Sequence, residues 1–227
     1  MAKYIIQNYG PHGVNLNWAL AGKGRTKVER VKRRLFTSIL ERVQTTENFE
    51  LEILDAGSES PQELDAICER AKIVIAAPLG PCSSAGTQLV ESCLRTGTDY
   101  INPSAETLWM YDIIERFETE AIKQNVRIVL GCGGFSALTD LAVLSIVSVI
   151  RKEAEPIIIH YIGPTRECLN TGAIAALLYL FEPEHYADVQ NMQRAVFDPL
   201  ILTRRRSKIA KPNDQKLPYY SSYLKRW

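Results

Sequence analysis

Two glycine-containing segments have the residue types that bind a phosphorylated cofactor. The first, Gly22-Lys23-Gly24-Arg25, follows a run of strand length at 15–21 and precedes a basic helical pattern. In a dinucleotide-binding fold the second strand ends at the adenosine ribose, where an acid selects NAD and a base accommodates the 2′-phosphate of NADP. This segment has two bases and no acid, which favours NADP. The alternative is a solvated basic turn leading into a basic helix.

The second segment is Gly131-Cys132-Gly133-Gly134-Phe135-Ser136, which also lies between a strand-like run and a helical pattern. Ser136 stands where a dinucleotide fingerprint has its third Gly or Ala, and the next apolar run ends without a ribose-binding acid. A glycine-rich turn with another role is therefore the favoured interpretation. In the alternative, this segment binds the dinucleotide and residues 1–125 form a separate α/β unit.

Three residues are candidates for a catalytic acid, and the sequence does not choose among them. Cys82 follows the apolar run 73–77, at the strand end where open α/β sheets bind ligands. A packing role is the alternative for a thiol without a visible base. Tyr100 and Ser136 are the other two candidates. We find no Ser-His-Asp order and predict no metal site.

Composition excludes several classes of protein. The chain has 227 residues, of which 46% are hydrophobic and 23% charged, as in a globular protein with a core. The net charge of +1 provides no field for nucleic acid. Five cysteines without a CxxC pair indicate a reducing compartment. Without a signal peptide or a run of about 20 apolar residues, we expect an intracellular protein, cytoplasmic or peripheral on an organelle or lipid-droplet surface.

Strand-like and helix-like runs alternate along the sequence. This alternation predicts an α/β fold with a doubly wound, largely parallel sheet. The expected strands are 15–21, 49–54, 73–77, 99–102, 126–130 and 156–162; the expected helices are 1–10, 26–43, 61–70, 83–96, 106–124, 139–150 and 172–181.

A set of short motifs stands in a familiar order. It comprises Trp18-Ala19-Leu20-Ala21-Gly22-Lys23, Gly80-Pro81, Gly97-Thr98-Asp99-Tyr100 with Glu106, and Gly134-Phe135-Ser136 with Asp140-Leu141. Together these motifs resemble the saccharopine dehydrogenase-like oxidoreductases, a family that includes the bacterial trans-acting enoyl reductases. The resemblance covers about residues 2–181. It implies an NADP-type Rossmann domain at 1–152 and the start of a second α/β domain, which covers the substrate, at 153–227.

The resemblance also assigns sides of a site. It places NADP(H) at Gly22, Lys23, Arg25, Asp55, Ala56, Gly80 and Pro81, and the substrate side at Asn102, Glu106, Phe135, Ser136 and Asp140. The implied reaction is hydride transfer from NADPH to an unsaturated or imine-type, lipid-related acceptor. We expect a small-molecule or lipid-like substrate and no nucleic-acid partner, and a homo-oligomer remains open.

The sequence departs from this family at its start. Family members open with a strand and a turn of the form GATGFTG, whereas this sequence begins with the helix that would follow. That strand would be central, between the runs at 15–21 and 73–77, in the order 3-2-1-4-5-6. We therefore expect the 227-residue chain to bind NADP(H) weakly or not at all and to fold poorly. The alternative function is a non-catalytic Rossmann-like protein at a lipid or organelle surface, which would suit the basic segment Arg204–Arg206.

Overall fold

The computed structural model describes most of the first 150 residues. The described residues are 1–9, 16–40, 51–56, 60–77, 82–104, 106–133 and 137–150, with Leu178 and Leu202. Apart from these two leucines, the expected second domain at 153–227 lies outside the described residues. The chain groups into two compact units, one of Met1–Val74 with Gln88–Asp99 and one of Ile75–Thr87 with Tyr100–Trp227.

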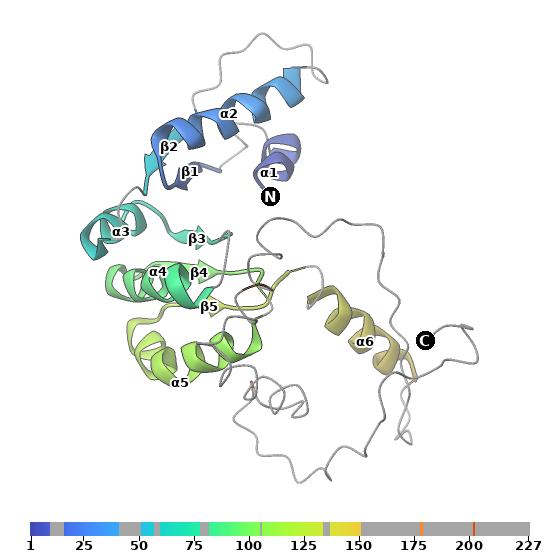
Figure 1. Cartoon of the computed structure of the whole chain (residues 1–227). Helices are drawn as coiled ribbons and strands as arrows, with labels where there is room; N and C mark the ends of the chain where they lie inside the picture. The colour runs from blue at the N-terminus through green and yellow to red at the C-terminus, as the bar shows by residue number, and fades with distance from the viewer. Residues whose placement is uncertain are drawn as a thin grey trace. The chain divides into compact units, whose positions relative to one another are not determined.

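Helices and strands alternate in the order that the sequence predicts, which confirms the α/β class (Figure 1). The helices are α1 (Ala2–Tyr9), α2 (Arg25–Leu40), α3 (Pro61–Cys68), α4 (Cys82–Thr96), α5 (Thr107–Gln124) and α6 (Ala137–Ile150). The strands are β1 (Ala19–Gly22), β2 (Glu52–Asp55), β3 (Ile73–Ile75), β4 (Asp99–Ile101) and β5 (Ile128–Val129). The strands are shorter than expected, most clearly β1, which covers only the end of the run at 15–21.

The strands form two sheets, β1-β2 and β3-β4-β5. β1 is parallel to β2, and β4 is parallel to β5. The Asp99 amide donates to the Lys72 carbonyl (3.0 Å) and the Ala76 amide to the Ile101 carbonyl (2.8 Å), so β3 also runs parallel to β4. In the Rossmann order 3-2-1-4-5-6, the pair β1-β2 matches strands 2 and 3, and β3-β4-β5 matches strands 4, 5 and 6. Within the described residues, no strand pairing joins β1 of the first sheet to β3 of the second.

Local signals account for the helix ends. Ser60 caps α3 by accepting the Glu63 amide (3.3 Å), and Pro61 occupies the first helical position, where its missing N–H costs nothing. α5 ends at Asn125, which adopts the left-handed conformation with φ of 55°.

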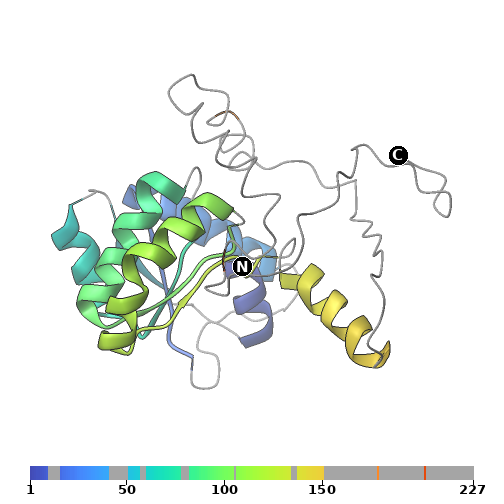
Figure 2. The same ribbon diagram turned by 90° about the horizontal axis from the view of Figure 1, so that it is seen from below.

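The predicted apolar face of α4 is buried, since Val90 and Cys93 are fully buried and Leu94 is 5% exposed. The first turns of α4 lie beside α5 (Figure 2). Trp109 Nε1 donates to Thr87 Oγ1 (2.9 Å), and both residues belong to the second unit. α6 instead exposes much of its apolar surface, including Leu141, Leu144 and Val149. Among the described residues, no helix has the length and apolar character needed to cross a membrane.

Candidate functional site

The parallel pairing of β1 and β2 brings two predicted cofactor segments together. Gly22 at the end of β1 is in register with Asp55 at the end of β2. The Ala56 amide donates to the Gly22 carbonyl (3.0 Å), which extends the pairing past the strand ends. The turn after β1 and the residues after β2 therefore meet at the carboxyl edge of this sheet, where α/β folds bind ligands.

Asp55 determines the conformation of the turn after β1. Its carboxylate accepts the Gly24 amide (3.1 Å, Oδ1) and the Arg25 amide (3.3 Å, Oδ2), at the N-terminus of α2. The Gly24 carbonyl accepts the Lys27 amide (2.8 Å), which starts the helix. Gly24 has φ of 88°, a conformation that costs other residues about 1–2 kcal/mol. We call Gly22–Arg25 with Asp55 the amide turn.

The amide turn presents cations as well as amides. Lys23 and Arg25 are exposed, and the Arg25 side chain is 69% exposed although its Nε lies 3.2 Å from Glu29 Oε1. An exposed pair of this kind contributes only about 0–1 kcal/mol, so an arriving phosphate can displace the carboxylate. Because the Gly24 and Arg25 amides already donate to Asp55, the exposed side chains of Lys23 and Arg25 are the donors that a 2′-phosphate would contact. The residues present therefore fit the adenosine end of NADP(H).

A surface hollow of about 820 Å³ lies along α2, and its lining includes Lys32, Arg33 and Glu52. Among the described site residues that the sequence predicted, only Arg25 lines this hollow. The lining mixes cations with the carboxylates of Glu29 and Glu52, so its charge selects neither sign of ligand.

A second cluster at the end of β4 includes the catalytic candidate Tyr100 and the substrate-side residue Asn102. Tyr100 and Asn102 are fully buried, and Asn102 Nδ2 donates to the Tyr100 hydroxyl (2.9 Å). Asn102 Oδ1 accepts the Ser104 amide, and the Asn102 carbonyl accepts the Cys132 amide (3.1 Å). We call these four residues the Asn102 node. Ser104 Oγ in turn donates to Glu106 Oε1 (3.0 Å).

The geometry of Gly131–Gly133 favours a packing role for these glycines. The Cys132 amide is bonded to Asn102, as is its thiol, whose Sγ lies 3.3 Å from the same carbonyl. A Cβ at Gly133 would collide with the Pro103 carbonyl oxygen, so the close approach of the two loops requires glycine. A phosphate-binding turn needs accessible amides, and the Cys132 amide is already used.

The structure thus separates the sequence-predicted residues into two groups. Gly22, Lys23, Arg25, Asp55 and Ala56 lie together at the end of β1 and β2. Tyr100, Asn102 and Glu106 belong to the buried cluster or its edge. Asp140 is exposed in the first turn of α6. Gly80, Pro81, Phe135 and Ser136 lie outside the described residues, as does the side chain of Cys82, which begins α4.

Sequence reasoning missed two features. It placed Asp55 near the adenine but not on the amides that begin α2, a contact between residues 30 apart in the chain. It also missed Cys68 and Cys93, whose sulfurs lie 3.7 Å apart although the residues are 25 positions apart on different helices. Neither spacing has a local sequence signal. In the described part of the chain, no three His, Cys, Asp or Glu side chains group as metal ligands would.

The fold defines a Rossmann-like α/β protein, and the amide turn lies at the carboxyl end of one of its parallel strands. Its sequence is 32% identical over 135 residues to a Mycobacterium tuberculosis protein provisionally named a trans-acting enoyl reductase, over 60% of this chain and 30% of that protein. Identity to the trans-acting enoyl reductase of Mycobacterium leprae is 31% over 55% of this chain and 28% of that protein. Identity to the Mycobacterium ulcerans protein of the same name is 28%, over 60% of this chain and 30% of that protein.

These similarities relate the chain to proteins named as reductases. The chain spans about 30% of the length of the curated relatives it matches. No family model matches the sequence, and no solved structure matches it.

Proposed function

We propose that this chain carries the NADP(H)-binding part of a saccharopine dehydrogenase-like oxidoreductase. The reaction would be hydride transfer to an unsaturated or imine-type acceptor. The observation that carries this proposal is the amide turn, in which Lys23 and Arg25 flank the N-terminus of α2 at a parallel strand end. The relatives named enoyl reductases support the same class of reaction.

In this proposal the chain's own residues bind and orient the cofactor, which supplies the hydride when bound. Lys23 and Arg25 neutralise the 2′-phosphate, and Asp55 holds the turn in the conformation that presents them. An acid at the end of β1 would select NAD, and Gly22-Lys23 stands in its place. The preference for the phosphorylated cofactor therefore depends on two side chains that can be removed without touching the core.

The test compares the Kd of NADPH with that of NADH for the chain and for Lys23→Ala/Arg25→Ala. We expect the double variant to weaken NADPH binding about 30-fold and NADH binding less than twofold, as loss of two charge-assisted contacts of about 1 kcal/mol each implies. An equal loss for both cofactors would contradict the assignment of this turn.

The matched control is Arg30→Ala/Arg34→Ala, which removes the same charge from exposed positions of the same helix. These residues lie roughly 8 and 14 Å along the helix axis from Arg25, by the rise of about 1.5 Å per residue. At physiological salt the Debye length is about 8 Å, so their effect on a phosphate at the turn is screened. We expect this variant to change the NADPH Kd less than threefold.

A further inference from the structure

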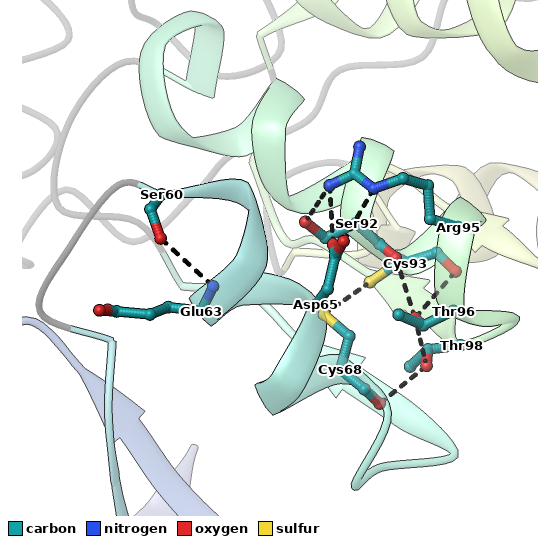
Figure 3. Close-up of polar contacts among 9 residues, drawn as sticks. All are labelled: Ser60, Glu63, Asp65, Cys68, Ser92, Cys93, Arg95, Thr96 and Thr98. Atoms are coloured by element: carbon teal, nitrogen blue, oxygen red, sulfur yellow. Dashed lines mark hydrogen bonds and ion pairs between the residues drawn. The ribbon is translucent and has the colours of Figure 1, made fainter.

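Cys68 and Cys93 place two thiols in contact between α3 and α4. Their sulfurs are 3.7 Å apart, both side chains are fully buried, and both thiols are free. Figure 3 shows the sulfurs facing each other from the two helices. A disulfide has an S–S length of about 2.05 Å, so the sulfurs must approach by about 1.7 Å.

A two-pronged ion pair holds the helices in this register on one side of the thiols. Arg95 Nε donates to Asp65 Oδ2 (3.0 Å) and Arg95 Nη2 to Asp65 Oδ1 (2.7 Å). Arg95 Nη2 also donates to Ser92 Oγ (2.9 Å), beside Cys93 in the sequence. Paired Arg–carboxylate bonds fix orientation as well as distance, so this contact limits sliding of α3 along α4.

Thr98 fixes the end of α3 on the other side. Its hydroxyl donates to the Cys68 carbonyl (2.8 Å; Figure 3). The hydroxyl also donates to the Ala71 carbonyl (3.3 Å). Thr98 is 2% exposed, so these bonds are shielded from water. The two thiols therefore lie between two independent contacts and have little freedom to separate.

We propose that Cys68 and Cys93 are a redox modification site, at which hydrogen peroxide converts the thiol pair into a reversible disulfide that links α3 to α4. In the first step the Cys68 thiolate attacks one peroxide oxygen, the O–O bond breaks, and a sulfenic acid and hydroxide form. In the second step the Cys93 sulfur displaces the sulfenic oxygen, which leaves as water after protonation. The pair loses two protons and two electrons, and one peroxide becomes two waters.

The electrostatics of the pair assign Cys68 as the attacking sulfur. The hydrogen bond between the two thiols lowers the pKa of Cys68, while burial opposes the shift. The same hydrogen bond and burial raise the pKa of Cys93. Because the thiolate is the nucleophile, the lowered pKa favours Cys68 as the first sulfur to react. Burial of both sulfurs makes the reaction depend on local opening of the α3–α4 contact, so it is slower than oxidation of the exposed Cys132.

The test oxidises the native 227-residue chain with hydrogen peroxide, alkylates remaining thiols and maps peptides without reduction. We expect a linked peptide pair joining Cys68 to Cys93, a mass lower by two hydrogens, and full reversal by dithiothreitol. The oxidised chain should melt several degrees higher than the reduced chain, because the bond closes a loop in the unfolded state. Unlinked Cys68 and Cys93 after oxidation, or bonds from either to another cysteine, would overturn the proposal.

Three variants resolve the roles of the residues. In Cys93→Ser the sulfenic acid at position 68 should persist and be trapped by dimedone, whereas in Cys68→Ser position 93 should remain unlabelled. Labelling of position 93 would overturn the assignment of the attacking sulfur. Asp65→Asn weakens the α3–α4 contact that must open before peroxide reaches the buried sulfurs, so it should form the linked peptide faster than the wild type, and an unchanged or slower rate would contradict a role of this ion pair in holding the thiols closed. Peptide mapping of the oxidised wild-type chain tests the proposal even where a variant folds poorly.

Discussion

The amide turn and the Asn102 node lie in equivalent places, each at the carboxyl end of a parallel strand, and they differ in what surrounds them. In the amide turn, the exposed carboxylate of Asp55 accepts the Gly24 and Arg25 amides, and the side chains of Lys23 and Arg25 are exposed. In the Asn102 node, the side chains of Tyr100 and Asn102 are fully buried and bonded to each other. A strand end can therefore bind a ligand only where its polar groups are exposed and can exchange a protein partner for a ligand. Buried and paired groups at the same kind of position serve the fold.

The strongest test of this contrast is removal of Asn102. Asn102→Ala takes the acceptor from the Ser104 amide and a donor from the Tyr100 hydroxyl. Each buried polar group that loses its partner costs about 1–3 kcal/mol, so we expect the free energy of unfolding to fall by about 3 kcal/mol. Urea unfolding measures the loss.

Asn8→Ala is the matched control, since Asn8 makes an exposed side-chain bond to the Tyr4 carbonyl (2.9 Å). We expect it to change the stability by less than about 0.5 kcal/mol. Similar losses for the two variants would show that burial does not distinguish the two positions.

Two glycines offer a smaller version of the same comparison. Gly133→Ala forces a Cβ into the Pro103 carbonyl and should cost about 2–3 kcal/mol through overpacking. A Cβ at Gly24 would meet only the flexible Lys27 side chain, at 3.9 Å, so Gly24→Ala costs only its strained conformation, about 1 kcal/mol. Chemical denaturation gives both values. The reverse order of destabilisation would contradict the packing role of Gly133.

Removal of Asp55 tests the amide turn itself. Asp55→Ala leaves the amides that begin α2 without their acceptor, and loss of such a cap costs about 1 kcal/mol. Asp55→Asn keeps one oxygen acceptor and should recover about half of this stability. Thermal melts of the two variants beside the wild type measure the effect, and equal stability of all three would mean that the turn is held by other contacts.

The smallest effect is expected for the ion pair between Asp65 and Arg95, which is polar and partly exposed. Hydrogen bonds from Arg95 hold the pKa of Asp65 below its usual range. The stabilisation is therefore complete above the unfolded pKa of about 3.9 and is lost as the pH falls through the folded value. Because both side chains are partly exposed, we expect about 0.5 kcal/mol.

Urea unfolding of the wild type and of Asp65→Asn at pH 7 and at pH 2 tests this sign. The two proteins should differ at pH 7 and converge at acid pH. A gap that widens toward acid pH would contradict the assignment.

Local patterns predicted most of the fold because the forces involved are local. Helical spacing identified the buried face of α4, and alternation of strand and helix identified the parallel sheets. The cap of α2 by Asp55 joins residues 30 apart, and the thiol pair joins residues 25 apart, so neither leaves a periodic signal. The contact between Tyr100 and Asn102, by contrast, does have a signal. Tyr100 and Asn102 are two apart at the end of a strand, which places both side chains on one face of the sheet.

The central claim is that the amide turn binds the phosphorylated end of the cofactor and that the Asn102 node does not. Two-dimensional ¹H–¹⁵N NMR of the 227-residue chain, titrated with 2′,5′-ADP and separately with 5′-ADP, tests it most directly. We predict saturable shifts of the Gly22, Lys23, Gly24 and Arg25 amides with 2′,5′-ADP, much weaker shifts with 5′-ADP, and no shift at Asn102 or Ser104. Equal responses to the two nucleotides, or shifts confined to the Asn102 node, would contradict the account.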